Sequence, residues 1–226
     1  MPKIIKTQLE PRKSPVQARS SASVEAICEA TIQVLLTVGK ERLTTTKVAA
    51  RAGVSVGTLY QYFPNKSSLL QAVLRKHMEE VTRAVEEVCA KQRGGELEQM
   101  ADVLVEAFLA AKLRHVEASK ALYYVSDDVG GAEIVRQLGV RGIKAIAEML
   151  ESSGARFSED VQVMAATVMA AMSGVSRRML EASKLPETLA SMRDGLQVMV
   201  RAYVNACVVT AGAGSTKTAV SARPLS

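Results

Sequence analysis

The hydrophobic residues of this chain recur at intervals of three and four along most of its length. We find no run in which apolar and polar residues alternate as they do in a half-buried strand. The pattern therefore predicts an all-α protein. The first helix is predicted over residues 16–38, where a single apolar stripe ends at Gly39.

Two short helices follow, predicted over residues 45–52 and 56–62 and separated by Gly53. A helix, a tight turn that contains Gly and a second short helix form the helix-turn-helix arrangement. One side of this pair is apolar and is expected to pack the two helices together: Val48, Ala49, Ala52, Val54, Leu59 and Phe63. The other side is polar, which suits insertion into a DNA major groove and contact with the flanking phosphates.

The longest predicted helix runs from Lys66 to Gln92 and follows Asn65, a favourable N-cap residue. At ~1.5 Å per residue it spans roughly 40 Å, which is enough to join two domains. The next helix, over 100–113, is apolar around most of its circumference, as expected for burial on all sides. Further helices are predicted over 119–125, 132–151, 159–182 and 187–208, and Gly139 and Gly142 favour a bend in the second of these.

Composition divides the chain into four parts. Residues 1–15 contain three prolines and scattered charges, and we expect them to form a flexible basic arm. Residues 16–66 are expected to form a helix-turn-helix domain, and residues 67–211 a second helical domain. The segment 212–226 is rich in Gly, Ser, Thr and Ala, and we expect it to be disordered.

The last two predicted helices, 159–182 and 187–208, have long apolar seams. The first of them also carries small residues on more than one face: Ala166, Ala170, Ala171, Ser173 and Gly174. Small residues let helices approach closely. Packing within one chain explains part of this pattern, and pairing with a second chain is the alternative.

The chain has 226 residues, 48% of them hydrophobic and 23% charged, which is the range of folded proteins and excludes wholesale disorder. Its formal net charge of +6 lies at one end, because residues 1–66 hold ten Lys and Arg residues against four Glu residues. The rest of the chain carries equal numbers of basic and acidic residues. This asymmetry indicates contact with a polyanion such as nucleic acid, although a solvated basic tail accounts for part of it.

Other classes of protein find little support. No stretch holds the ~18 uninterrupted apolar residues of a membrane helix, and the first residues lack the apolar run of a signal peptide, so we expect a cytoplasmic protein without membrane contact. Cys28, Cys89 and Cys207 have neither metal-binding nor redox spacing, which indicates reduced structural thiols. With two histidines, His77 and His115, and no protease or hydrolase motif, we expect no enzyme activity, no metal and no cofactor.

The helix-turn-helix region carries a family resemblance. Its segments are Ile27-Cys-Glu-Ala, Thr44-Thr-Thr-Lys-Val-Ala, Gly53-Val-Ser, Gly57-Thr-Leu-Tyr, Tyr62-Phe-Pro-Asn-Lys and Leu69-Leu. Over roughly residues 20–74 this pattern resembles the DNA-binding domain of the tetracycline-repressor (TetR) family. The resemblance implies an all-α homodimer of about nine helices per subunit. It also implies an N-terminal operator-binding domain and a C-terminal domain that holds an inducer pocket and the dimer interface.

The resemblance also assigns roles to particular residues. The start of the second helix matches positions that touch phosphate, Thr44 and Thr45, and a base-contacting position, Thr46, with Lys47 beside it. The recognition helix includes Val56, Gly57, Thr58 and Gln61, and the residues that match backbone-holding positions are Tyr60, Tyr62 and Lys66. Many members carry a histidine where this chain has Tyr62. Half-buried structural tyrosines and a solvated lysine are the alternative interpretations.

The composition of the recognition helix carries some information about the DNA sequence it reads. It contains no Arg, so the bidentate recognition of guanine that Arg provides is absent from this helix. Threonine methyl groups, Val56 and Gln61 favour thymine methyl groups and adenine edges.

The C-terminal part resembles the family only in layout, and its sequence identifies no ligand. Large apolar residues of the middle helices are expected to line a pocket: Met100, Leu104, Phe108, Tyr123, Tyr124, Met149, Met169 and Met172. Plain core packing is the alternative for any one of them. His115 is a candidate hydrogen-bond partner for a ligand, and a surface histidine or a core histidine with its hydrogen bonds satisfied is the preferred alternative.

Together these patterns predict a ligand-responsive transcriptional regulator of the repressor type. It is expected to bind a palindromic stretch of double-stranded operator DNA as a homodimer and to be released by a small hydrophobic or aromatic inducer. The alternative is a helical protein that binds DNA non-specifically through its basic end, as an architectural protein without an inducer.

Overall fold

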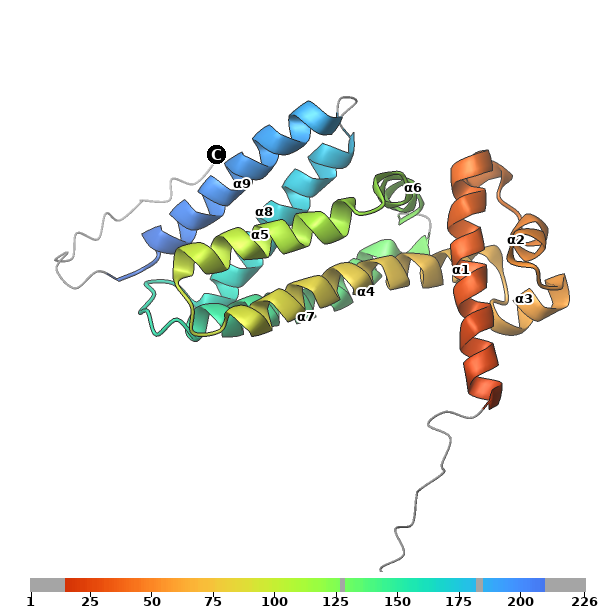
Figure 1. Ribbon diagram of the computed structural model, residues 1–226, viewed down its shortest axis with the longest axis horizontal. Helices are drawn as coiled ribbons and strands as arrows, with labels where there is room; N and C mark the ends of the chain where they lie inside the picture. The colour runs from red at the N-terminus through yellow and green to blue at the C-terminus, as the bar shows by residue number, and fades with distance from the viewer. Residues whose placement is uncertain (1–14, 127–128, 182–184, 210–226) are drawn as a thin grey trace, which may run out of the picture.

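The computed structural model describes residues 15–126, 129–181 and 185–209, and every extended regular element within these ranges is a helix (Figure 1). In chain order the helices are α1 (Pro15–Arg42), α2 (Thr45–Ala52), α3 (Val56–Tyr62), α4 (Lys66–Gln92), α5 (Leu97–Leu113), α6 (Val116–Ser126), α7 (Gly131–Glu151), α8 (Val161–Glu181) and α9 (Leu185–Ala206). The predicted all-α class is therefore confirmed. The predicted arm, apart from Pro15, and the predicted tail lie outside the described residues.

Local capping explains why the first helices begin and end where they do. The side chains of Thr44 and Ser55 accept hydrogen bonds from the backbone N–H groups of Lys47 and Thr58, which caps α2 and α3. Asn65 and Ser68 form a reciprocal capping box at the start of α4. These side chains satisfy N–H groups that the first turn of a helix leaves without partners.

Two glycines end helices at the positions that the sequence predicts. Gly53 closes α2 in the left-handed conformation, with φ 68°. Gly39 has φ 77° and ψ 169°, so the regular part of α1 ends there and a short turn continues to Arg42. Gly139 and Gly142, where the sequence predicts a bend, do not interrupt α7, which is one continuous helix from Gly131 to Glu151.

Hydrophobic side chains form two clusters. The N-terminal cluster joins α1, α2 and α3 to the first turns of α4 and to parts of α6 and α7, with Ile27, Leu59 and Leu69 fully buried. The C-terminal cluster joins the rest of α4 to α5, α7, α8 and α9, with Val85 and Met164 fully buried. α4 runs along both clusters, from the α1–α3 end of the molecule to the far end of the helical bundle (Figure 1). α7 packs beside it and also contributes to both, with Ile134 in the N-terminal cluster and Ile146 in the C-terminal cluster.

One segment, Ser20–Arg42 in α1, is long and apolar enough to cross a membrane by length and composition, with a mean hydropathy of 1.3. Core helices of water-soluble proteins meet the same criterion. In this structure α1 packs against α2, α4 and α6 and buries Ile27 and Leu35 in the N-terminal cluster.

Candidate DNA-binding surface and ligand cavity

The helix-turn-helix is assembled as the sequence predicts. Val48, Ala49, Leu59 and Phe63 are buried between α2, α3 and the neighbouring helices. Ala52 and Val54 pack against the same cluster while remaining partly exposed. The apolar side of the helix pair is therefore buried in the N-terminal cluster, and its polar side faces away from the core.

All eleven residues that the resemblance assigns to DNA lie at the surface. Seven are exposed: Thr44, Thr46, Lys47, Val56, Gly57, Tyr60 and Gln61. Four are half-buried: Thr45, Thr58, Tyr62 and Lys66. The structure brings them together on α2, on α3 and at the start of α4, at the end of the molecule farthest from α9 (Figure 1).

Several of these side chains already hold the motif in shape. The hydroxyl groups of Thr45 and Tyr60 lie 3.1 Å apart and join the start of α2 to α3. The hydroxyl of Thr58 lies 2.8 Å from that of Ser55, the residue that caps α3. Thr44 is itself the cap of α2. The hydroxyl groups are therefore placed by bonds within the protein.

The two lysines of this surface have a structural contact that their sequence does not reveal. The Lys47 ammonium donates to the carbonyl of Arg42 at 2.9 Å, and the Lys66 ammonium donates to the carbonyl of Lys40 at 2.8 Å. Both carbonyls belong to the short turn that follows Gly39 at the end of α1. A lysine carries three N–H donors, so each ammonium retains donors for a phosphate.

A cavity of about 380 Å³ lies in the second half of the molecule, between α4, α5, α6, α7 and α8. Of the eight residues that sequence assigns to a pocket, Phe108, Tyr123 and Met169 line this cavity. The other five do not line it: Met100, Leu104, Tyr124, Met149 and Met172.

Packing explains why these five residues are elsewhere. Met100, Leu104, Met149 and Met172 fill the interior of the C-terminal cluster and have essentially no exposed surface. Tyr124 follows Tyr123 directly on α6, and adjacent residues of a helix point about 100° apart. Tyr124 is accordingly 68% exposed.

The cavity also contains polar residues that the sequence analysis does not select. They are His77, Thr82, Lys112, Ser119, Ser126, Ser173, Ser176 and Arg177. A signal for one of them exists, because Lys112 is the single basic residue of the strongly apolar helix α5. Periodicity alone does not show whether such a lysine turns toward solvent or toward a cavity.

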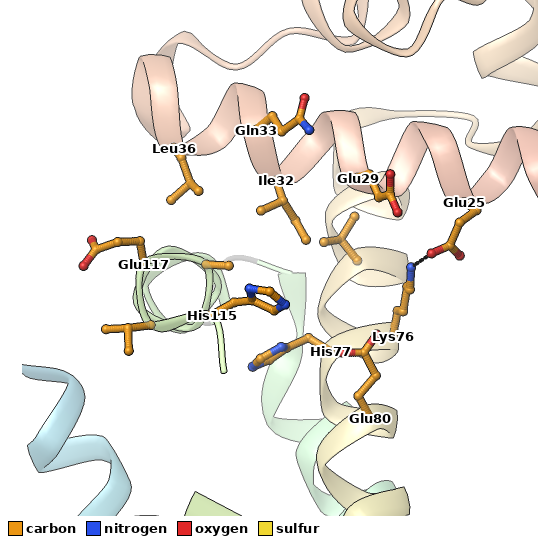
Figure 2. Close-up of a pocket in the computed structure, with 13 residues that line it drawn as sticks. Glu25, Glu29, Ile32, Gln33, Leu36, Lys76, His77, Glu80, His115 and Glu117 are labelled. Carbon is orange, nitrogen blue, oxygen red and sulfur yellow. Dashed lines mark hydrogen bonds and ion pairs between the residues drawn. The ribbon is translucent and has the colours of Figure 1, made fainter. Parts of the chain in front are cut away.

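A second hollow, of about 580 Å³, lies between α1, α4 and the start of α6 (Figure 2). It is lined by charged groups of both signs, including Glu29, Glu80 and Glu117, and by the ion pair of Lys76 with Glu25 that ties α4 to α1. Figure 2 shows the rings of His77 and His115 side by side at its wall. His77 lines both this hollow and the cavity, so it stands between them.

Two family models match this chain. Residues 27–73 match the model of bacterial regulatory proteins of the tetR family, and residues 96–203 match the tetracyclin repressor-like C-terminal domain. The chain belongs to the TetR family. It is therefore a DNA-binding transcriptional regulator rather than an enzyme.

Relatives and solved structures agree with this assignment. An uncharacterised HTH-type transcriptional regulator of Mycobacterium tuberculosis is 27% identical over 149 residues, which cover 63% of this chain and 74% of the relative. A transcriptional regulator from Rhodococcus has a TM-score of 0.65 at 22% identity, covering 83% of this chain and 99% of that one. SmeT, the repressor of a multidrug efflux pump in Stenotrophomonas maltophilia, has a TM-score of 0.61 at 19% identity, covering 89% and 97% of the two chains.

In this TetR-family chain a polar junction connects three helices beside the cavity. The Ser119 hydroxyl on α6 donates to the backbone carbonyl of Lys112 on α5 at 2.8 Å. The Nε2 of His77 on α4 lies 3.2 Å from the same hydroxyl. Because the single hydroxyl proton is used on the carbonyl, the His77 Nε2–H must be the donor to Ser119.

The electrostatics of the junction keep His77 neutral. Burial, with the nearby positive charges of Lys112 and His115, lowers the pKa of His77 from 6.5 to about 4. Burial also lowers the pKa of Lys112.

The cysteines are free and buried, and burial raises the pKa of Cys28 and takes that of Cys89 to about 12. Among the described residues no group of three His, Cys, Asp or Glu side chains is placed to hold a metal ion.

The lowered pKa of His77 predicts a specific loss of stability in acid. Below pH 6.5 the unfolded chain takes up a proton at His77, whereas the folded chain does so only near pH 4. Stability is therefore lost as the pH falls through this window, by up to ~3 kcal/mol. Urea unfolding of wild type and His77→Gln between pH 7 and pH 4 should show a shallower loss in the variant.

The matched control is His115→Gln, which removes the exposed second histidine. This variant should lose stability with falling pH much as the wild type does. Equal pH dependence in wild type and His77→Gln would show that His77 is not held neutral by the fold.

Proposed function

We propose that this TetR-family regulator is a repressor that binds a palindromic operator as a homodimer and is released by a small hydrophobic or aromatic inducer. The observation that carries the proposal is the position of α4. This helix begins at the DNA-binding surface with Lys66 and, further along, forms a wall of the cavity with Val81 and Val85. One rigid element thus connects the two sites that such a regulator needs.

We assign DNA binding to residues 16–66, and ligand binding and dimerisation to residues 67–211. Phosphate contacts are assigned to Thr44, Thr45, Tyr60, Tyr62 and Lys66, and a base contact to Thr46, with Lys47 beside it. The recognition helix presents Val56, Gly57, Thr58 and Gln61 to the DNA. Surface exposure and the internal hydrogen bonds that fix these side chains support the assignment. Cytoplasmic location follows from this role, and we propose no membrane contact.

The proposed dimer interface lies on α8 and α9. Large apolar side chains are exposed there: Val163 by 55%, Val198 by 58% and Met199 by 45%. Small residues lie beside them at helical spacing, with exposed Ala170 on α8 and exposed Gly195 and Ala202 on α9. Exposed apolar surface of this kind marks an interaction site, and small residues permit close helix packing.

The proposed switch runs from the cavity through α6 to α1. Leu122 and Tyr123 of α6 line the cavity, and α6 packs against α1, which supports the helix-turn-helix. A ligand that displaces α6 would therefore tilt α1 relative to α4. It acts only through its different affinities for the two dimer geometries, and a ~100-fold loss of operator affinity requires about 2.7 kcal/mol of coupling.

Selection of DNA from a random pool with the full-length protein tests the proposed function. The expected product is a palindrome whose half-sites lie about one helical turn, ~34–36 Å, apart or at a spacing reached by bending. Hydrophobic and aromatic compounds are then titrated against the protein with and without this DNA, and an inducer binds the free protein more tightly. Equal affinity for selected and scrambled DNA would favour the architectural alternative.

The assignment of Lys66 to phosphate predicts a uniform effect on DNA binding. Lys66→Ala should weaken binding to selected and scrambled DNA alike and reduce the slope of log affinity against log salt by about one unit. Thr58→Ala should instead change base preference more than salt dependence. Fluorescence anisotropy at several salt concentrations measures both effects.

The control for Lys66→Ala is Lys91→Ala, because Lys91 is an exposed lysine at the opposite end of α4. Its replacement should leave affinity and slope unchanged. Melting curves of both variants separate lost DNA contact from loss of the Lys66 bond to the carbonyl of Lys40. An unchanged slope in Lys66→Ala would remove this lysine from the interface.

The proposed interface predicts monomers when a charge is placed on it. Val198→Glu or Ala170→Glu would bury an unpaired carboxylate at the contact, which costs several kcal/mol. Sedimentation equilibrium should show a folded monomer for each variant and a dimer for Val140→Glu, an exposed apolar residue on α7 that serves as control. Dimers of all three variants would place the interface elsewhere.

A further inference from the structure

The cavity contains a positive charge that no described carboxylate balances. Lys112 projects into it from the last turn of α5, and its ammonium donates to the thioether sulfur of Met78, 3.6 Å away. A thioether is a weak acceptor. Among the described residues, no Asp or Glu lines the cavity.

The other charged or ionisable groups of the lining do not compensate Lys112. Arg177 already pairs with Glu181, at 2.9 Å, and lies over the ring of Tyr123, 4.6 Å from its centroid. His77 is neutral and donates its Nε2–H to Ser119. Lys112 is thus the one cation of the described lining with no oxygen acceptor in the structure.

The rest of the described lining is mostly apolar. Val81 and Val85 of α4, Phe108 of α5, Leu138 of α7 and Met169 of α8 form its walls. Placing an ammonium beside such walls removes water from it without supplying an ion partner, which is unfavourable for folding. A site of this kind becomes favourable when a ligand brings the missing negative charge together with apolar surface.

We propose that the ligand of this cavity is an amphipathic monocarboxylate, whose carboxylate pairs with Lys112 and whose apolar body lies against Phe108, Val81 and Met169. The inference rests on the proposed ligand-responsive function and specifies the chemical class of the inducer. A carboxylate placed on the Lys112 ammonium lies between α5 and α4, because that ammonium contacts the sulfur of Met78 on α4.

A structural role for Lys112 is the competing explanation. The last turn of a helix favours a positive charge, and the aliphatic stem of lysine packs on apolar residues. The two explanations differ in what happens when the charge is removed. A structural lysine stabilises the empty protein, whereas a ligand-binding lysine destabilises it and is needed only when the carboxylate is bound.

Calorimetric titration of the full-length protein with paired probes tests the proposal. The pairs are decanoate with 1-decanol and 2-naphthoate with 2-naphthylmethanol, which differ in charge but hardly in shape. We expect the acid to bind at least about tenfold more tightly than the alcohol in at least one pair. Lys112→Met should abolish this preference, and Lys112→Arg should retain it.

Lys91→Met is the matched control, since it makes the same change at an exposed lysine outside the cavity. It should leave the preference for the acid unchanged. Thermal melting without ligand is the second measurement. Lys112→Met should melt at a higher temperature than the wild type, because it removes a desolvated ammonium without an ion partner.

The other outcomes separate the carboxylate assignment, a structural role of Lys112 and the ligand cavity itself. Equal binding of acid and alcohol by the wild type, or a preference that survives in Lys112→Met, would overturn the carboxylate assignment and leave the ligand cavity standing. A lower melting temperature of Lys112→Met with an unchanged preference would assign the lysine a structural role. Binding of neither member of either pair would contradict the proposed ligand cavity, and this inference with it.

Discussion

The structure depends on two adjacent helices, α4 and α7, that each belong to both hydrophobic cores. α4 buries Leu69 and Val73 in the N-terminal cluster and Val81 and Val85 in the C-terminal cluster. A helix transmits displacement along its axis because its backbone hydrogen bonds keep it rigid. α4 therefore connects the packing of the two halves of the molecule, and the cavity lies where α4 leaves one core and enters the other.

Where α4 passes from one core to the other, most polar groups beside the cavity have hydrogen-bond partners. The Ser119 hydroxyl accepts a hydrogen bond from the N–H of His77 and donates one to the carbonyl of Lys112, and these two bonds join α4, α6 and α5. An unpaired polar group in such surroundings costs about 1–3 kcal/mol, so the junction is stable only in this arrangement. Lys112 is the exception, because its ammonium has only the thioether of Met78 as an acceptor. Polar groups without a strong partner are typical of sites where a ligand supplies it.

On the candidate DNA-binding surface too, polar side chains form hydrogen bonds within the protein. Lys47 and Lys66 hold the end of α1 through carbonyl groups, and Thr45 and Tyr60 join α2 to α3. Side chains suited to phosphate are thereby ordered before DNA arrives, which lowers the entropy lost on binding. Movement of α1 would also disturb the two lysines, because their acceptors are part of that helix.

Sequence alone determined the helices and the DNA-binding motif, because their signals are local. Thr44, Ser55 and Asn65 are caps within a few residues of the N–H groups they satisfy, and Gly53 is the turn residue between α2 and α3. The lining of the cavity was decided by tertiary structure. Met100 and Phe108 share a face of α5, yet of the two only Phe108 lines the cavity. Lys112 points into the cavity, although lysine side chains are mostly exposed to solvent. Helical periodicity identifies an apolar face, whereas the neighbouring helices determine which part of that face is filled and which part stays open.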